Sequence, residues 1–150
     1  MDFFPAREII PGLWIGSSAD ASNPRFMACH DIGLIINCSK DIPCSFSRDI
    51  PTVRIPIHDA AYENLTMLRY LPRVVRTIEK KLRSGVSVLV HCYAGVSRSS
   101  SVVAAYLMYK YGLEKNEAIT FIQQRKSETF SNGVIFNRAL NSFDMIKYYI

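Results

Sequence analysis

A short apolar run followed at once by a loop of small and polar residues is the feature that most constrains the fold. Residues 87–90 are rich in β-branched side chains and predict a buried strand. The chain then passes through Cys92 into a loop centred on Gly95. From 99 to 111 nearly every residue is small or apolar, which predicts a helix buried on most sides and ended by Gly112. This order, strand then tight loop then helix, is typical of proteins that bind anions at a helix N-terminus.

Other apolar runs predict further strands. Residues 13–16 and 34–38 are short apolar runs of the kind that fills a buried strand. Residues 53–57 form a weaker run, in which Pro56 indicates either a sheet edge or the end of a strand.

Apolar residues at three- or four-residue steps predict further helices. These helices cover residues 23–30, 65–82, 115–126 and 133–148. Asn23 is expected to cap the first helix and Pro24 to occupy its first position. The second contains Pro72, so this helix either begins at Pro72 or is kinked there. The side chains expected to face inward are Leu65, Leu68, Leu71, Val75, Ile78, Leu82, Ala118, Phe121, Ile122, Phe136, Ala139, Leu140 and Phe143.

Strands that alternate with helices indicate an α/β fold. We predict a mostly parallel central sheet of four to five strands, flanked by helices on both faces. The chain shows no internal repeat and no linker-like segment, so residues 1–150 are interpreted as a single domain. In such sheets ligand sites lie at the carboxyl ends of the strands, which is where this prediction places Cys92.

The cysteines and histidines argue against a disulfide framework and against a metal site. The cysteines are Cys29, Cys38, Cys44 and Cys92, with no CxxC pair, and the histidines, His30, His58 and His91, are scattered. This usage favours a reducing compartment. We therefore expect a cytoplasmic location, with the nucleus as a second option, and neither metal nor cofactor.

The N-terminus and the charge limit where the chain resides and what it binds. Residues 1–5 lack the basic and apolar regions of a signal peptide, and Asp2 excludes myristoylation. No apolar stretch is long enough to predict a membrane span. The formal net charge of +5 favours an anionic partner, whether phosphorylated protein, nucleic acid or an anionic membrane surface. Charge alone does not choose among them.

The loop after Cys92 is suited to a tetrahedral dianion. It consists of Tyr93, Ala94, Gly95, Val96 and Ser97. Its backbone N–H groups and the first turn of the following helix supply hydrogen-bond donors and the positive end of the helix dipole. Gly95 permits a backbone conformation that a Cβ would obstruct. We interpret residues 93–98 as a phosphate-binding loop.

The residues on either side of this loop supply a nucleophile, a phosphate-binding arginine and two residues that stabilise the sulfur and the loop. A thiol at a helix N-terminus beside an arginine loses its proton readily, so Cys92 is the expected nucleophile. Arg98 can hold two phosphate oxygens at once through its planar guanidinium. Ser99 is expected to donate its hydroxyl toward the sulfur, and His91 to order the loop through hydrogen bonds rather than to act as a base.

Such a reaction also needs an acid for the leaving group. Asp59 follows the predicted strand at 53–57 and would project from a loop at the same edge of the sheet. There it can protonate the leaving oxygen and then activate the hydrolytic water. Asp41 and Asp49 lie too early in the chain for this role, and Glu63, in the same loop, is the nearer competitor.

These residues resemble a known family. His91, Cys92, five loop residues, Arg98 and Ser99 match the HCxxGxxR[ST] signature of protein tyrosine phosphatases. The rest of the chain looks like the small dual-specificity phosphatases: residues 10–17 are similar to their opening strand and turn, 35–39 to their second core strand, and 104–108 to the "AYLM" of their helix after the loop. Asp59 matches their general acid.

The resemblance implies a fold, an activity and one further residue. It implies the tyrosine-phosphatase fold and hydrolysis of phosphotyrosine, phosphoserine and phosphothreonine in proteins through a phosphocysteine. Asn132 falls where the family often has a Ser-Pro-Asn turn that supports the phosphate loop, with Ser131 in place of the proline.

Two alternative functions stay open. The same chemistry could act on a non-protein substrate, either a phosphoinositide or an RNA 5′ end. The loop carries no lysine for extra phosphates, which argues against inositol polyphosphates. A catalytically dead phosphate-binding module is disfavoured because Cys92, Arg98 and Asp59 are all kept.

Further residues have two interpretations each. Cys38 is either a small buried hydrophobe or the partner of Cys92 in a reversible disulfide. Tyr62 and Tyr93 either pack simply or flank the bound phosphoresidue. A basic stripe of Arg69, Arg73, Arg76 and Lys80 follows helical spacing and is either a solvated face or a docking surface. The oligomeric state is left open.

Overall fold

The computed structural model describes residues 5–44 and 49–150. The interpretation of the first residues as neither signal peptide nor myristoylation site falls on residues 1–4 and lies outside these ranges.

A five-stranded, mostly parallel sheet forms the centre of the molecule. Its strands are β1 (Arg7–Ile10), β2 (Leu13–Gly16), β3 (Ile32–Asn37), β4 (Thr52–Arg54) and β5 (Ser87–His91). The strand order is β1-β2-β5-β3-β4, in which β1 runs antiparallel to β2 and the other neighbours are parallel. The predicted fold class is confirmed, and β5, which leads into the phosphate-loop sequence, lies in the middle of the sheet.

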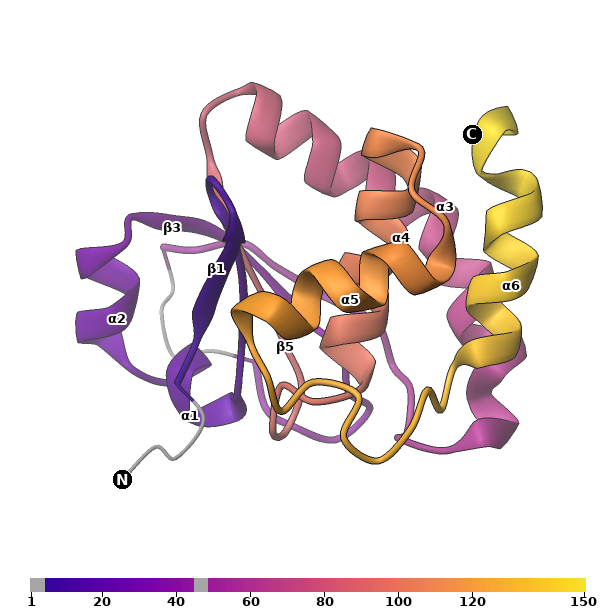
Figure 1. The fold of residues 1–150 in the computed structure, drawn as a ribbon. Coiled ribbons are helices and arrows are strands. Elements are labelled where there is room, and N and C mark those ends of the chain that lie inside the picture. The colour runs from indigo at the N-terminus through magenta and orange to yellow at the C-terminus, as the bar shows by residue number, and fades with distance from the viewer. Residues whose placement is uncertain (1–4, 45–48) are drawn as a thin grey trace.

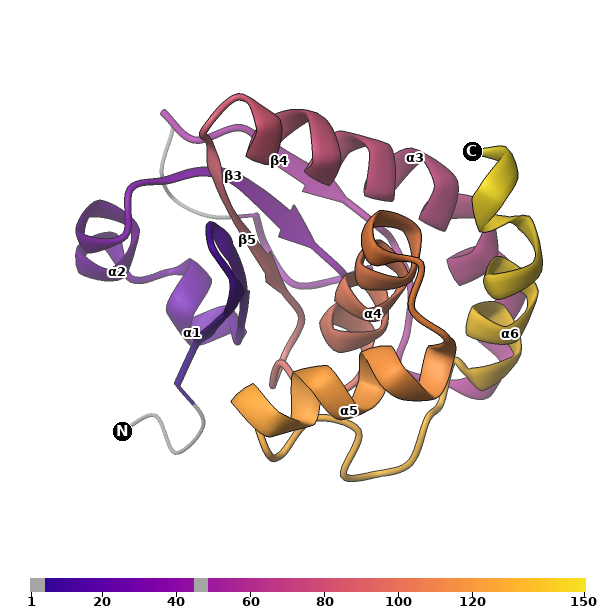
Figure 2. The same cartoon turned by 45° about the horizontal axis from the view of Figure 1, so that its top comes forward.

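Helices cover both faces of this sheet (Figures 1 and 2). The helices are α1 (Ser18–Ala21), α2 (Pro24–Cys29), α3 (Asn64–Arg83), α4 (Arg98–Tyr111), α5 (Lys115–Arg125) and α6 (Asn137–Ile146), with short 3-10 turns η1 (Ala61–Glu63) and η2 (Lys147–Tyr149). On one face, α3, α5 and α6 pack around α4, and α1 and α2 lie on the other face.

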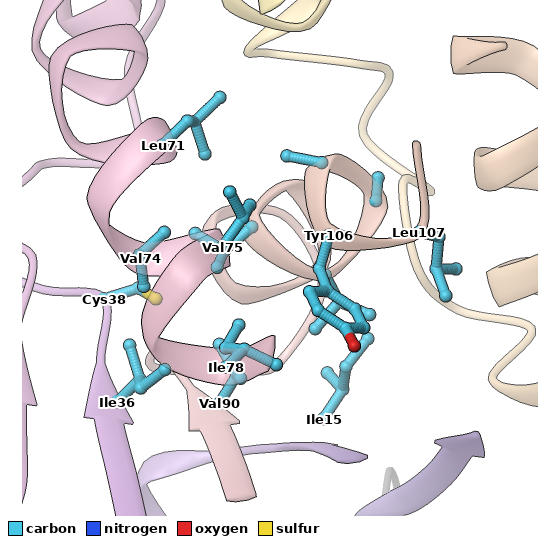
Figure 3. Close-up of a cluster of buried hydrophobic side chains, with 14 of the residues drawn as sticks. Ile15, Ile36, Cys38, Leu71, Val74, Val75, Ile78, Val90, Tyr106 and Leu107 are labelled. Carbon is cyan, nitrogen blue, oxygen red and sulfur yellow. The ribbon is translucent and has the colours of Figure 1, made fainter. Parts of the chain in front are cut away.

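Alternation along the strands builds a core on each face. Ile36 and Val90 belong to the large cluster beneath α3 and α4, whereas their neighbours Ile35 and Leu89 belong to the smaller cluster beneath α1 and α2. Figure 3 shows part of the large cluster, with the side chains of α3 over those of the sheet. Because the central strands are buried on both faces, they show continuous apolar runs rather than alternation.

The strand predictions are confirmed with two refinements. Strand β4 is an edge strand and ends at Arg54, so residues 55–57 of the predicted run lie beyond it, with Pro56 two residues past its end. Strand β1 was not predicted as a strand of its own. Two of its residues, Arg7 and Glu8, are exposed, so it lacks the apolar run that revealed the central strands.

Helix α3 differs from its prediction at its beginning. It starts at Asn64 and passes through Pro72, so the interpretation that the helix begins at Pro72 was wrong. Asn64 secures the first turn, because its side chain donates to the Ile135 carbonyl (3.0 Å) and accepts from the Ala139 amide (2.8 Å). Leu65, expected inside, is 58% exposed.

The later helices follow the pattern closely. Gly112 ends α4 in the left-handed conformation at φ 68°, as predicted. Helix α6 begins at Asn137 rather than at residue 133, because Gly133 has φ 88°, which is incompatible with helix. Within the described ranges, no helix combines the length and the apolar character that crossing a membrane requires.

Candidate active site

The predicted phosphate loop lies at the carboxyl end of the central strand. Strand β5 ends at His91, residues 92–97 form the loop, and α4 begins at Arg98. Gly95 and Ser97 are buried in this loop, Ala94 and Val96 are half-buried, and Tyr93 is exposed. The strand–loop–helix order predicted from the sequence is therefore confirmed.

The carbonyl groups of the loop are held by surrounding protein. Tyr93 O accepts from the Ser18 amide (3.1 Å), Gly95 O from the Ser100 hydroxyl (3.2 Å), Val96 O from the Phe130 amide (2.8 Å) and Ser97 O from the Ser101 amide (2.8 Å). In a trans peptide group the carbonyl and the next N–H point in opposite directions. Fixing the carbonyls outward therefore turns the following N–H groups toward the inside of the loop.

These N–H groups are unused donors. None of the backbone amides from Tyr93 to Ser97 donates to an acceptor within the part of the chain that the structure describes. Backbone N–H groups need an acceptor, so successive amides without one in a single loop form a site for an anion. The loop is thus organised to receive the oxygens of a phosphate group.

Cys92 and Ser99 contact one another at the base of this loop. The Cys92 side chain is nearly inaccessible at 3% exposure, and its Sγ lies 3.2 Å from Ser99 Oγ. A hydroxyl at this distance can donate to a sulfur that carries negative charge. The structure brings the two residues together as the sequence predicted.

Arg98 connects the phosphate loop with the loop that carries Asp59. Its Nη1 donates to the Ile57 carbonyl at 3.2 Å, and its Nε has no partner among the described residues. The free Nε and the second terminal nitrogen are donors available to a bound oxyanion. One guanidinium thus joins two segments that are far apart in the sequence.

Asp59 lies in the segment between β4 and η1, and its side chain is exposed. Glu63, the competing acid, is engaged elsewhere, because its Oε2 accepts from the His58 amide at 2.8 Å. That hydrogen bond closes the loop around Asp59 and leaves Asp59 as the loop's unengaged carboxylate. The geometry favours Asp59 over Glu63 for proton transfer.

His91 is buried beneath the loop. Its Nδ1 lies 3.4 Å from the Cys92 carbonyl, and burial lowers the pKa of the imidazole from 6.5 to about 4. The ring is therefore neutral near pH 7. A neutral ring against the Cys92 carbonyl fits the predicted ordering role.

Acidification should weaken the fold through His91. A group whose pKa is lower in the folded than in the unfolded state stabilises the fold above its unfolded pKa, and this stability is lost as pH falls. Between pH 7 and pH 5 the wild type should lose about 2 kcal/mol of unfolding free energy through this residue. Urea unfolding at both pH values, with His91→Asn as the comparison, measures the effect. Equal pH dependence in both proteins would contradict it.

The support expected from Asn132 comes instead from another residue. Asn132 is exposed, and its side chain makes no hydrogen bond to any described residue, so the structure shows no contact between Asn132 and the loop. Phe130 provides the contact through its backbone N–H to Val96 O. Phe130 has φ 61°, an unusual conformation for a bulky residue, and this local turn directs its amide toward the loop.

A buried lysine behind the loop was not predicted. The side chain of Lys126 is fully buried, and its Nζ pairs with Glu128 and donates to the Pro5 carbonyl (3.3 Å). Its Cε lies 3.4 Å from where a Cβ on Gly95 would stand. Sequence reasoning also missed the loop-binding hydroxyls of Ser100 and Ser101, although a run of serines opening an otherwise apolar helix is a signal for such a role.

Gly95 is required by both its conformation and its surroundings. It has φ 71°, and a Cβ there would lie 2.8 Å from the Gly16 carbonyl oxygen. This oxygen is a backbone atom, so it cannot move away as the end of a flexible side chain could. Gly112, with φ 68°, has no atom within 4 Å of the same position.

Gly95→Ala should therefore misplace the loop, whereas Gly112→Ala should not. We expect Gly95→Ala to lower kcat/KM on an aryl phosphate by about 10²-fold, because the loop amides move relative to Cys92. Gly112→Ala should cost about 1 kcal/mol of stability from the left-handed backbone and leave kcat/KM unchanged. Steady-state kinetics and thermal unfolding of both variants test this. Similar kinetic losses in both would show that the close contact with Gly16 is unimportant.

Cys38 lies beside Cys92 at the end of the neighbouring strand. The Cys38 amide donates to the His91 carbonyl at 2.7 Å, which continues the pairing of β3 with β5 by one residue. Cys38 belongs to the large buried cluster, and Figure 3 draws it just past the end of its strand, in the same cluster as side chains of α3. Burial and then the neighbouring Cys92 raise the pKa of Cys38 well above its ordinary value. All four cysteines are free thiols, and the disulfide between Cys38 and Cys92 stays a hypothesis.

Comparison with known proteins agrees with this site. The model of the family "Dual specificity phosphatase, catalytic domain" matches residues 13–145. Human dual specificity protein phosphatase 9 is 37% identical over 131 residues, which are 86% of this chain and 33% of that protein. Dual specificity protein phosphatase Mpk3 of Drosophila melanogaster is 36% identical over 140 residues, 91% of this chain and 33% of that protein. The chain thus spans about a third of the length of these curated relatives.

Solved structures give the same result. The crystal structure of human DUSP28 has a TM-score of 0.86 and 27% sequence identity, covering 94% of this chain and 93% of that one. The protein belongs to the dual specificity phosphatase family of the protein tyrosine phosphatase superfamily.

Proposed function

We propose that this chain hydrolyses phosphate monoesters on phosphotyrosine and on phosphoserine or phosphothreonine of proteins, through a phosphocysteine intermediate. One observation carries this proposal: the loop carbonyls are held outward and the loop amides are left unpaired around Cys92. Membership of the family supports the substrate class.

In the first step, the Cys92 sulfur attacks phosphorus and the ester P–O bond breaks. The loop amides and Arg98 hold the three non-bridging oxygens, whose charge they match in the transition state. Asp59 gives a proton to the departing oxygen, so an alcohol or phenol leaves rather than its anion.

In the second step, water replaces the sulfur. Asp59, now a carboxylate, takes a proton from the water as its oxygen attacks phosphorus. The S–P bond then breaks and the sulfur leaves as a thiolate, which the Ser99 hydroxyl 3.2 Å away can stabilise. Inorganic phosphate is released and the enzyme returns to its starting state.

Two exposed tyrosines, close in sequence to Asp59 and Cys92, support a protein side chain as the substrate. Tyr62 and Tyr93 are 75% and 70% exposed, so their rings are free to contact a substrate backbone or a phosphotyrosyl ring. The loop residues between Cys92 and Arg98 carry no charge, so a substrate with several phosphates finds no extra cation there.

A substrate panel tests the proposal. The wild-type protein is assayed on phosphotyrosyl and phosphothreonyl peptides, inositol phospholipids and 5′-triphosphorylated RNA. We expect turnover on both peptides, faster than on lipid or RNA. Turnover on RNA or lipid alone would overturn the proposed substrate class.

Asp59→Ala should show which residue is the acid. We expect kcat on an alkyl phosphate to fall by about 10²- to 10³-fold, and kcat on an aryl phosphate with a good leaving group to fall much less, since that group needs little protonation. The control is Glu63→Gln, which keeps an oxygen that can accept from the His58 amide but removes the acid. Asp59 would not be the acid if Asp59→Ala lowered kcat equally on both substrates. The same conclusion would follow if Glu63→Gln, rather than Asp59→Ala, lowered kcat mainly on the alkyl phosphate.

The cytoplasmic location stays a prediction. The four free thiols support a reducing compartment, since two of them are exposed and would otherwise be oxidised readily. Fractionation of cells that produce the full-length protein would test it.

A further inference from the structure

The outer face of α3 carries a row of cations. Arg69, Arg73, Arg76 and Lys80 are all exposed, whereas Met67, Leu71, Val74, Val75 and Ile78 on the other side of the helix are buried. In Figure 2, α3 lies along the outside of the molecule, with the sheet and α4 on its inner side. We call the four cationic residues the α3 basic stripe.

The charge of this stripe is not compensated. Glu79 is the one acidic residue of α3, and it pairs with Lys110 of α4 at 2.9 Å. No stripe residue forms an ion pair within the described residues. Four unpaired like charges on one helix face repel one another, and an anion bound to the stripe would reduce this repulsion.

One end of the stripe borders a hollow. Thr66, Arg69, Tyr70 and Arg73 line a surface recess of about 440 Å³. Two guanidinium groups with two hydroxyls beside them are the donors that a carboxylate or a phosphate oxygen accepts from. The recess therefore offers an anchoring point for one anionic group, and the rest of the stripe extends away from it.

We propose that the α3 basic stripe binds an acidic segment of the phosphoprotein substrate. From Arg69 to Lys80 the helix rises about 17 Å at about 1.5 Å per residue, which is the span of roughly five extended peptide residues. Helix α3 begins directly after η1 and the loop that carries Asp59. A substrate whose phosphoresidue occupies the site can thus place a flanking acidic run on the stripe. This inference rests on the proposed function and adds to it a preference for acidic flanking sequence.

A peptide fits this face better than nucleic acid or membrane does. Single-stranded nucleic acid needs exposed aromatic rings for base stacking, and Tyr70 on this face is half-buried against the core. Membrane binding needs several exposed apolar side chains next to the cations, whereas the large exposed hydrophobic residue of α3 is Leu65 alone, one turn before Arg69.

Direct binding tests the inference apart from catalysis. The probes are two fluorescent peptides without phosphate, one with a run of five Asp or Glu and one with Gln at those positions, and a single-stranded oligonucleotide. Binding is measured by anisotropy to wild type, to Arg73→Glu and to Arg25→Glu. Arg25 is exposed on α2, so Arg25→Glu changes the net charge equally at a place remote from α3.

We expect wild type and Arg25→Glu to bind the acidic peptide, more weakly as salt increases, and Arg73→Glu to bind at least tenfold more weakly. Equal losses in both variants would show that net charge alone matters, and tighter binding of the oligonucleotide than of the acidic peptide would replace the peptide as ligand. Either result overturns the inference.

Kinetics separate failure of this inference from failure of the proposed function. On phosphopeptides with the same two tails, Arg73→Glu should raise KM for the acidic one about tenfold at unchanged kcat, and leave the neutral peptide and an aryl phosphate unaffected. Turnover of both peptides without an acidic preference would contradict the stripe alone. Acidic-peptide binding without any phosphopeptide turnover would contradict the proposed function and leave the stripe without a substrate role.

Discussion

Replacement of Cys92 by serine is expected to lower kcat on every phosphate monoester by a factor of at least about 10⁴. A serine hydroxyl is a poor nucleophile unless a base removes its proton. The neighbour of Cys92 Sγ is the Ser99 hydroxyl at 3.2 Å, whereas the nearby imidazole of His91 places its Nδ1 3.4 Å from the Cys92 carbonyl. The variant therefore lacks the means to form a covalent intermediate.

Substrate binding should survive this change. The loop amides are oriented by carbonyl contacts that do not involve the sulfur, so Cys92→Ser should still bind phosphate and phosphopeptide. Single-turnover kinetics and isothermal titration measure the two effects separately. The control is Cys29→Ser, an exposed cysteine on α2, which should retain full activity. Retained turnover in Cys92→Ser would refute the nucleophilic role.

The second large effect is expected from Arg98→Lys. Lysine keeps the positive charge but has one nitrogen, so it cannot hold two phosphate oxygens and the Ile57 carbonyl together. Arginine residues that clamp a transferring phosphoryl group are worth about 10³-fold or more in kcat, and we expect a loss of that order.

Arg98→Lys should also loosen the loop that carries Asp59, because the hydrogen bond to Ile57 O is lost. The kcat loss should thus be accompanied by weaker dependence on leaving-group quality. Steady-state kinetics on alkyl and aryl phosphates, with circular dichroism to establish folding, measure both effects. Arg25→Lys, the same replacement on α2, should be neutral. An Arg98→Lys variant within tenfold of wild type would show that charge alone suffices.

Most of the proposed catalytic residues could be identified from the sequence because they are contiguous. Residues 91–99 form one continuous segment, and its spacing follows from the turn it must make between strand and helix. Asp59 was proposed from the sequence as well, since it follows a strand that ends at the same edge of the sheet. The fold class followed from apolar runs alternating with helical patterns, as the central strands confirm.

What sequence reasoning missed lies in contacts between distant segments. Asn132 was expected to support the loop, whereas the Phe130 backbone does so, because backbone hydrogen bonds depend on local dihedral angles and leave no mark in side-chain identity. Lys126 was predicted only as the last residue of a helix, yet its side chain is buried behind Gly95 and paired with Glu128. The antiparallel edge strand β1 was missed because half of it faces solvent.

The sequence by itself determined which chemical groups we propose to act, since the proposed nucleophile, the proposed arginine clamp and the loop lie within one turn between a strand and a helix. Only the tertiary structure decided how that loop is held open for an anion. Ser18, Ile57 and Phe130 reach it from three separate parts of the chain, brought together by the strand order β1-β2-β5-β3-β4. Such long-range hydrogen bonds depend on the packed positions of whole elements, and no local pattern records them.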